Sequence, residues 1–166
     1  MVDFLVIGSG SLAGSVNSIF ELFRDKKMRY GYSISGGYRM FEIPDDYDFY
    51  GAVCKEELGK RYIAVVVRWF TNMRDDCHPP LVLSRKYVEG EYKKFDDTDI
   101  INIDKTKDIP NNYMGLMGVP IAFLDKWNYE QFDVIGVGVS GAGGVDMFAP
   151  IVEGDYKYRR ILIKRK

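Results

Sequence analysis

Short apolar runs separated by glycine-containing turns dominate the chain and predict a fold built mostly from strands. Residues 2–7 (VDFLVI) form an almost continuous apolar run that ends at a glycine. Such a run is typical of a strand buried on both faces of a parallel sheet. Apolar residues at helical spacing then predict a helix over residues 15–27, with Lys26 and Lys27 near its last turn, where cations suit the helix dipole.

Further along, the pattern favours antiparallel strands. Residues 29–35 and 38–43 flank Gly36-Gly37, and a two-residue glycine loop between alternating runs predicts a β-hairpin. The strongest strand signal is the run at residues 62–70 (YIAVVVRWF), which we expect to be a central strand. Shorter candidate strands follow at residues 81–83, 118–124, 132–139 and 158–163, with one edge strand expected in the charge-rich stretch 84–112.

Length and composition fit one globular domain spanning residues 1–166. The chain is 46% hydrophobic and 28% charged, which suffices for a buried core and lies far from the composition of disordered proteins. Together with the pattern, this predicts an α/β fold in which a parallel N-terminal strand and a helix precede mainly antiparallel strands.

Charge and cysteine usage limit the settings in which the chain works. The formal net charge is -1, so attraction to nucleic acid requires a local basic site. Only Cys54 and Cys77 are present, too few for a disulfide framework, and the chain opens without the pattern of a secretory signal peptide. No apolar stretch approaches the roughly 20 residues that span a bilayer. We therefore expect a cytoplasmic protein that does not enter the membrane.

Residues 8–14 (GSGSLAG) form a glycine-rich turn between a predicted strand and a predicted helix, as in dinucleotide-binding folds. The third glycine comes one position late for that motif, and the acidic residue expected about 20 residues further on is missing. Glycines in a tight turn explain the same residues. A nucleotide site in a small α/β enzyme is therefore the weaker alternative.

His78 is the only histidine, and Asp75, Asp76 and Cys77 beside it offer metal-type ligands. Adjacent residues rarely point at one centre, and the sequence offers no second ligand pair at zinc-site spacing, so a solvated loop is favoured over a metal site. The glycine-rich stretch 136–144 has the composition of a phosphate cradle. It is followed by no P-loop lysine, which favours a hairpin connection.

The last ten residues hold six cations around a short apolar strand, and Tyr158 lies among them. The cations are Lys157, Arg159, Arg160, Lys164, Arg165 and Lys166. This arrangement suits contacts to phosphates. A strand that ends in a soluble basic tail explains the same residues, and the sequence leaves both alternatives open.

Several long motifs, in matching order and spacing, resemble those of the EcoRI-type adenine-specific DNA methyltransferases. The motifs lie at residues 41–47 (FEIPDDY), 67–72 (VRWFTN), 108–110 (DIP) and 114–128 (MGLMGVPIAFLDKWN). The resemblance extends to residues 4–8, 131–136 and 158–166, so it covers nearly the whole chain.

The resemblance implies a function, but the catalytic motif of the family is missing from this sequence. Members of the family transfer a methyl group from S-adenosylmethionine to N6 of adenine after flipping the base out of the duplex. An Asn/Asp-Pro-Pro-Phe/Tyr motif carries this chemistry, and that tetrapeptide does not occur in this sequence, where Pro79-Pro80 follows Cys77-His78. In the family the motif would precede the strand at residues 2–7. The resemblance therefore implies a partial methyltransferase-like sheet with no catalytic residue and no binding of S-adenosylmethionine by this chain alone.

The resemblance also implies that this part of the enzyme includes elements that face double-stranded DNA. The candidates are Arg68, Trp69, Thr71 and Asn72, because arginine and asparagine make paired contacts to guanine and adenine edges. Candidate phosphate contacts are Lys157, Arg159, Arg160, Lys164 and Arg165. The alternative is that Trp69 and its neighbour Phe70 are core residues and that Asn72 forms a turn.

Three functions are consistent with the sequence. The first is the C-terminal part of an adenine methyltransferase of a restriction-modification system, inactive alone and completed by a complementary chain. The second is a non-catalytic DNA-binding or regulatory relative, and the third is the small nucleotide-binding enzyme. In each case the first strand lacks flanking partners, so we expect its apolar edge to be covered by a second copy or by a partner chain.

Overall fold

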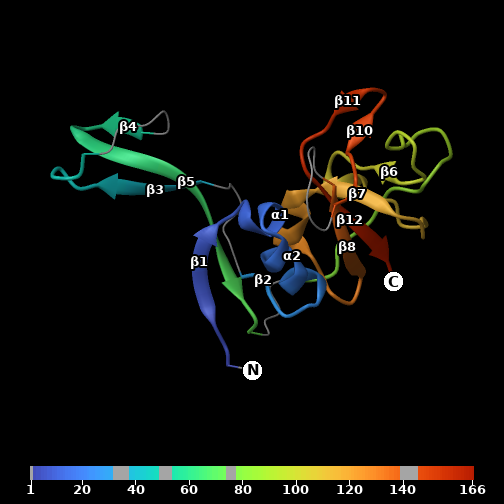
Figure 1. The fold of residues 1–166 in the computed structure, drawn as a ribbon, viewed down its shortest axis with the longest axis horizontal. Helices are drawn as coiled ribbons and strands as arrows, with labels where there is room; N and C mark the ends of the chain where they lie inside the picture. Colours follow the sequence, from blue (N-terminus) through green and yellow to red (C-terminus); the bar gives the residue numbers. More distant parts are fainter. Residues whose placement is uncertain (1, 32–37, 49–53, 74–77, 139–145) are drawn as a thin grey trace.

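A 12-residue strand, β5 (Lys60–Thr71), forms at the run predicted to be central and organises the first of two large sheets (Figure 1). The computed structural model describes residues 2–31, 38–48, 54–73, 78–138 and 146–166. All the other strands of this sheet pair antiparallel with β5, namely β1 (Leu5–Ser9), β2 (Arg29–Tyr30), β3 (Tyr38–Ile43) and β4 (Cys54–Glu57). The prediction of a central strand is confirmed.

The two ends of β5 serve different parts of the molecule. Its C-terminal end lies between β1 and β2 in the body, whereas its N-terminal end pairs with β3 and β4 and projects as an arm (Figure 1). Leu58 and Gly59 join β4 to β5 and both have positive φ (52° and 73°), as a two-residue hairpin turn requires. The sequence pattern did not predict this hairpin, because leucine is rarely found at such a position.

Strand β1 is antiparallel to β5, which corrects the expectation of a parallel first strand buried on both faces. Leu5, Val6 and Ile7 are each more than half exposed. An apolar run indicates a strand whose side chains are to be buried. The direction of that strand is set by a partner strand far along the chain, and the local pattern carries no information about that partner. The expected hairpin around Gly36-Gly37 falls partly outside the described residues, and β3 has β5 as its partner.

Two short helices replace the single helix expected over residues 15–27. Helix α1 (Leu12–Ser15) ends at Val16, whose extended backbone (φ −124°, ψ 113°) separates it from α2 (Asn17–Arg24). Phe20 and Phe23 of α2 are buried, as their helical spacing predicts. Among the described residues, no helix has the length and apolar character that crossing a membrane requires.

The second large sheet has the strand order β6-β7-β12-β8-β9. Its strands are β6 (Ile101–Asn102), β7 (Met117–Pro120), β8 (Phe132–Gly138), β9 (Asp146–Phe148) and β12 (Arg160–Arg165). Strand β12 is antiparallel to β7 and β8, while the two outer pairs are parallel. Strands form at the predicted segments 132–139 and 158–163 and within residues 84–112, whereas the segment 118–124 is a strand only as far as Pro120 and continues as a 3-10 helix.

Smaller elements complete the described structure. They are the hairpin of β10 (Ile151–Val152) and β11 (Asp155–Tyr156) and the 3-10 helices η1 (Thr106–Asp108) and η2 (Ile121–Lys126). Residues 81–83 do not form the expected strand. Instead, the Gln131 side chain accepts a hydrogen bond from the Leu81 amide at 2.7 Å and donates one to its carbonyl at 2.8 Å. A side-chain amide thus replaces a neighbouring strand at this point.

A buried apolar cluster joins the two sheets through α2. Phe23 packs edge-to-face against Tyr30 of β2 and Phe70 of β5, with ring centroids 4.9 and 6.1 Å apart. In the same cluster, Phe123 of η2 meets Phe132 of β8 edge-to-face at 5.5 Å. Aromatic rings prefer this geometry when they pack together. The predicted α/β class with mainly antiparallel strands is confirmed.

Gly118 of β7 lies against the buried ring of Phe95, and a Cβ at this position would overlap the ring carbons. We predict that Gly118→Ala lowers the free energy of unfolding by about 2 kcal/mol, because overpacking forces the ring or the backbone to move. Urea denaturation measures the loss. Adding Phe95→Leu should recover part of it by vacating space, and a double variant no more stable than Gly118→Ala would contradict this packing.

Asp133 of β8 accepts a hydrogen bond from Lys26 at 2.9 Å, and this bond lowers the pKa of Asp133 below its usual 3.8. Because the folded-state pKa is lowered, the stabilisation is present above the unfolded-state pKa and is lost as pH falls through the folded-state pKa. We predict that Asp133→Asn lowers the free energy of unfolding by about 0.5 kcal/mol at neutral pH, since both side chains are partly exposed. Denaturation across a pH series should show the difference closing in acid. A difference that stays constant would count against it.

Candidate functional site

A cleft of about 330 Å³ lies where the glycine-rich turn after β1 meets β5 and η2. The residues that line it include Ser9, Gly10, Ser11, Arg68, Asp125 and Tyr158. Three segments singled out in the sequence therefore meet here, namely the glycine turn, the VRWFTN run and the C-terminal basic segment. We call this candidate site the turn cleft.

Arg68 stands on β5 and forms a two-point ion pair with Asp125 of η2. Its Nε lies 2.6 Å from one carboxylate oxygen and its Nη2 lies 3.0 Å from the other. The Arg68 side chain is 14% exposed, and hydrogen bonding to Asp125 raises the pKa of Arg68 above its usual value. Arg68 is therefore held in a fixed position on the wall of the turn cleft, with its charge balanced by Asp125 and much of its donor fork already engaged.

Tyr30 of β2 anchors the glycine turn. Its hydroxyl donates a hydrogen bond to the Gly10 carbonyl at 2.8 Å, and the Gly10 amide donates to the Val66 carbonyl at 3.0 Å. Burial raises the pKa of Tyr30 well above its usual range, so the phenol remains a neutral donor. The turn is thus fixed to β2 and β5 at the same residue.

The glycines of this turn allow close packing. A Cβ at Gly8 would lie 2.9 Å from the Phe70 ring, and one at Gly14 would lie 2.6 Å from the Ile121 side chain. Both distances are shorter than carbon atoms tolerate. This packing explains why the segment is rich in glycine, as the tight-turn interpretation expects, and it gives the nucleotide-site alternative no further support.

The structure divides the C-terminal basic residues into two groups. Arg160 is buried, and its guanidinium donates to the side chains of Asn102 and Asp104 at 3.1 Å and to the Tyr158 carbonyl at 2.9 Å. Arg159 lies beside the turn cleft, where it donates to the Ser15 hydroxyl. The other three candidates are fully or partly exposed: Lys157, Lys164 and Arg165. Arg160 supports the fold, whereas the rest remain open to a ligand.

The remaining candidates do not gather at the turn cleft. The Thr71 hydroxyl donates to the Phe4 carbonyl at 2.7 Å, and the Asn72 side chain accepts from the Phe4 amide and donates to the Val2 carbonyl, both at 2.9 Å. These two residues anchor the start of β1. Trp69 is 39% exposed and lies on the opposite face of β5 from Arg68, because neighbouring strand residues alternate.

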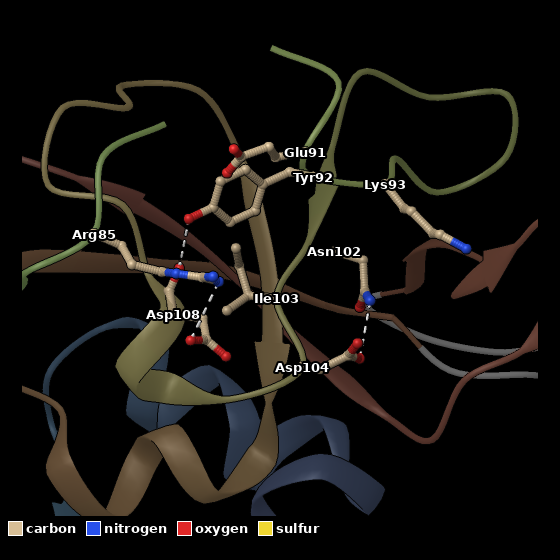
Figure 2. A pocket seen from close by; sticks show the side chains of 8 residues that line it. All are labelled: Arg85, Glu91, Tyr92, Lys93, Asn102, Ile103, Asp104 and Asp108. Atoms are coloured by element: carbon tan, nitrogen blue, oxygen red, sulfur yellow. Dashed lines mark hydrogen bonds and ion pairs between the residues drawn. The ribbon is translucent and has the colours of Figure 1, made fainter. Parts of the chain in front are cut away.

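A second cleft, of about 450 Å³, lies beside β6 and η1 (Figure 2). Arg85 lies 3.4 Å from a carboxylate oxygen of Asp108, and the Tyr92 hydroxyl donates to the Asp108 carbonyl at 3.0 Å. At its other end, Asn102 donates to Asp104 at 3.0 Å. Its lining carries three carboxylates (Glu91, Asp104 and Asp108) against two cations (Arg85 and Lys93), so this larger cleft offers less attraction to an anion than the rim of the turn cleft.

In the polar loop before residue 81, the contacts of His78 are with protein groups that hold the loop in place. Asn128 donates to the His78 carbonyl at 2.8 Å, and the His78 Nδ1 lies 3.5 Å from the Arg29 guanidinium. Asp75, Asp76 and Cys77 lie outside the described residues, as does most of the glycine-rich stretch 136–144. Over the part of the chain that the structure describes, no group of three or more metal-type ligands occurs.

Sequence reasoning missed two residues of the turn cleft. Asp125 falls within the MGLMGVPIAFLDKWN motif, but no local signal links it to Arg68, which lies 57 positions earlier. Tyr158 was noted only as an aromatic among cations, although it lines the cleft and is 72% exposed.

Comparison with a family model and with individual known proteins points in each case to methyltransferases. A family model described as "Adenine-specific methyltransferase EcoRI" matches residues 2–166. The Type II methyltransferase M.EcoRI of Escherichia coli is 39% identical over 165 residues, which are 93% of this chain and 49% of that protein. The Type II methyltransferase M.MpnI of Mycoplasma pneumoniae is 31% identical over 141 residues, or 80% of this chain and 43% of that protein.

A third relative, the Type II methyltransferase M.MgeORF184P of Mycoplasma genitalium, is 30% identical over 183 residues, covering 99% of this chain and 57% of that protein. The chain thus spans about half the length of the relatives it matches. No solved structure matches it.

Arg159 and Arg160 offer a matched pair of substitutions with unequal expected effects on stability. We predict that Arg160→Gln lowers the free energy of unfolding by about 2 kcal/mol, because buried polar partners lose a charged donor. Arg159→Gln should change it by less than about 0.5 kcal/mol, as is usual for surface positions. Thermal and urea denaturation of both variants test this. Equal losses in the two would show that Arg160 has no special structural role.

Proposed function

This chain belongs to the EcoRI family of adenine-specific methyltransferases, and we propose that it supplies one part of an enzyme that methylates adenine in DNA. The enzyme transfers a methyl group from S-adenosylmethionine to the N6 amino group of a flipped adenine. In this proposal the 166 residues act as one domain in the cytoplasm, within a restriction-modification system. They contribute sheet strands and DNA contacts, and a complementary half contributes the cofactor site and the catalytic motif.

One observation carries the proposal. The match runs along nearly the entire chain and yet covers only about half of each relative. The relatives' own names describe them as Type II methyltransferases. The 166 residues contain no Asn/Asp-Pro-Pro-Phe/Tyr tetrapeptide, which supports placing the catalytic motif and the S-adenosylmethionine site in the other half.

The turn cleft and its rim support a role in holding DNA. Exposed Tyr158 and partly exposed Arg159 stand side by side at the cleft, and Lys157 precedes them. Lys164 and Arg165 lie at the far end of β12, about 16 to 20 Å beyond Arg159 along the chain. We propose that these four cations contact phosphates of double-stranded DNA, and that Arg68, whose charge Asp125 balances, shapes the wall of the cleft.

DNA binding by the full chain tests the electrostatic part of the proposal. Four phosphate contacts predict that affinity for a DNA duplex falls by about 100-fold between 50 and 200 mM salt. Replacing Lys157, Arg159, Lys164 and Arg165 by glutamine should remove most of this dependence, as measured by fluorescence anisotropy. A matched control replaces four exposed lysines elsewhere, namely Lys55, Lys60, Lys93 and Lys94. Equal losses in both variants would remove the proposed contacts.

Methyl transfer tests the enzymatic part. The full chain should be co-expressed with the half of the E. coli relative that it does not match, and N6-methyladenine should be measured in duplex DNA. We predict methylation by the pair, and neither methylation nor thermal stabilisation by S-adenosylmethionine for the chain alone. Methylation by the chain alone would contradict the division of labour.

A second candidate function is a DNA-binding or regulatory relative without methyl transfer. The lack of the catalytic tetrapeptide in these residues favours it as much as it favours a half-enzyme. The co-expression experiment separates the two. Salt-dependent DNA binding with no methylation by the pair would favour the regulatory relative.

A further inference from the structure

The outer edge of β1 is open for strand pairing. Of the strands that the structure describes, only β5 pairs with β1, and β1 lies at the margin of the body (Figure 1). Its three apolar residues are each more than half exposed, with Leu5 at 54%, Val6 at 53% and Ile7 at 53%. An apolar, unpaired edge of this kind is a template for another strand.

The register shows which backbone groups face outward. Gly10 lies opposite Val66 in the same register as the ladder of β1 and β5, and its amide donates to the Val66 carbonyl. Hydrogen-bonded and non-bonded pairs alternate along an antiparallel ladder, so Gly8 and Val6 also direct their backbone groups toward β5. The amides and carbonyls of Leu5 and Ile7 therefore point away from β5, toward the open edge.

Among the described residues, one face of this sheet is also exposed, at Leu5, Ile7 and Trp69. Helix α2 packs on the face that carries Phe70, through Phe23. The opposite face carries Leu5 and Ile7, and Ile7 lies directly opposite Trp69 in the register. Trp69 is 39% exposed, and its neighbour across the β2 side is Gly31, which adds no side chain to cover it. The open edge and the bare face thus adjoin each other.

We propose that β1 and Trp69 form the docking surface for the other half of the methyltransferase, which adds a strand along Leu5 and Ile7 and covers the face that carries Trp69. The identity of this partner rests on the proposed function. The relatives have about as much chain again beyond the part that matches here. A strand that is apolar on both faces is typical of the interior of a sheet covered on both sides, which requires a continuing sheet and its cover rather than one peptide.

A second copy of the chain fits this surface less well. Two identical edges pair antiparallel about a two-fold axis perpendicular to the sheet, which leaves both pairs of helices on the same face. The face that carries Trp69 would stay bare in both copies. DNA also fits poorly, because Leu5, Ile7 and Trp69 offer neither charge nor hydrogen-bonding groups apart from the indole N–H.

Tryptophan quenching gives a direct readout of the docking surface. The chain has two tryptophans, and Trp127 is only 2% exposed, so Trp69 supplies the accessible emission. We expect acrylamide to quench Trp69 in the isolated chain, and the quenching to fall when the chain is co-purified with the unmatched half of the E. coli relative. The Trp69→Phe variant assigns the signal by removing its accessible component. Unchanged quenching in the complex would overturn the proposal, as would protection by DNA alone.

Two substitutions at Ile7 isolate the backbone contribution. Ile7→Pro removes the outward amide without breaking the ladder to β5, and proline is tolerated where an edge amide faces solvent. It should weaken association with the complementary half by about tenfold or more, whereas Ile7→Val, which keeps the amide, should weaken it by less than about threefold. Leu5→Lys, a third variant at an exposed position, should block association even if Ile7→Pro fails to fold.

The outcomes distinguish this inference from the proposed function. Association that depends on β1 but yields no methylated adenine would remove the proposed function and leave the docking surface in place. Methylation that persists at the wild-type level in folded Ile7→Pro and Leu5→Lys would remove the docking surface alone. Self-association that shields Trp69 in the isolated chain would show that the occupant is a second copy.

Discussion

The register of strand β5 is the constraint on which the rest of the structure depends. Four strands pair with it, so its alternation decides the environment of every neighbouring side chain. Phe70 points into the apolar cluster, Arg68 reaches the turn cleft on the same face, and Trp69 points to the bare face. A slip of one residue would exchange these faces and bring the charged group and the core into conflict.

The ion pair of Arg68 and Asp125 carries this constraint to the second sheet. It joins β5 to η2, which leads directly from β7, and Arg159 approaches the same turn just before β12. Removing charges from water costs much of what their attraction contributes, so this partly buried pair adds little net stability, and its main effect is to fix β5 against η2. In this structure that arrangement holds the glycine turn and the basic segment on one cleft.

The sequence predicted the elements whose signal is local and missed those set by distant partners. Residues 62–70 were recognised because a long β-branched run is itself the signal, whereas the direction of β1 depends on a strand that lies far along the chain, as in the pairing of Leu5 with Thr71. The helix predicted over residues 15–27 overlaps α2, which ends earlier at Arg24, and its break at Val16 was missed because one extended residue leaves the apolar spacing almost unchanged. At the site, Arg68 was selected by a motif, but its pairing with Asp125 depends on tertiary structure.

The central claim is that β1 is an interior strand of a larger sheet, exposed here along its outer edge. Amide hydrogen exchange at single-residue resolution tests this most directly. In the isolated chain, Val6 and Gly8 should be protected while Leu5 and Ile7 exchange quickly. When the chain is bound to the complementary half, Leu5 and Ile7 should become as protected as their neighbours. Rapid exchange at Leu5 and Ile7 in that complex would contradict the claim.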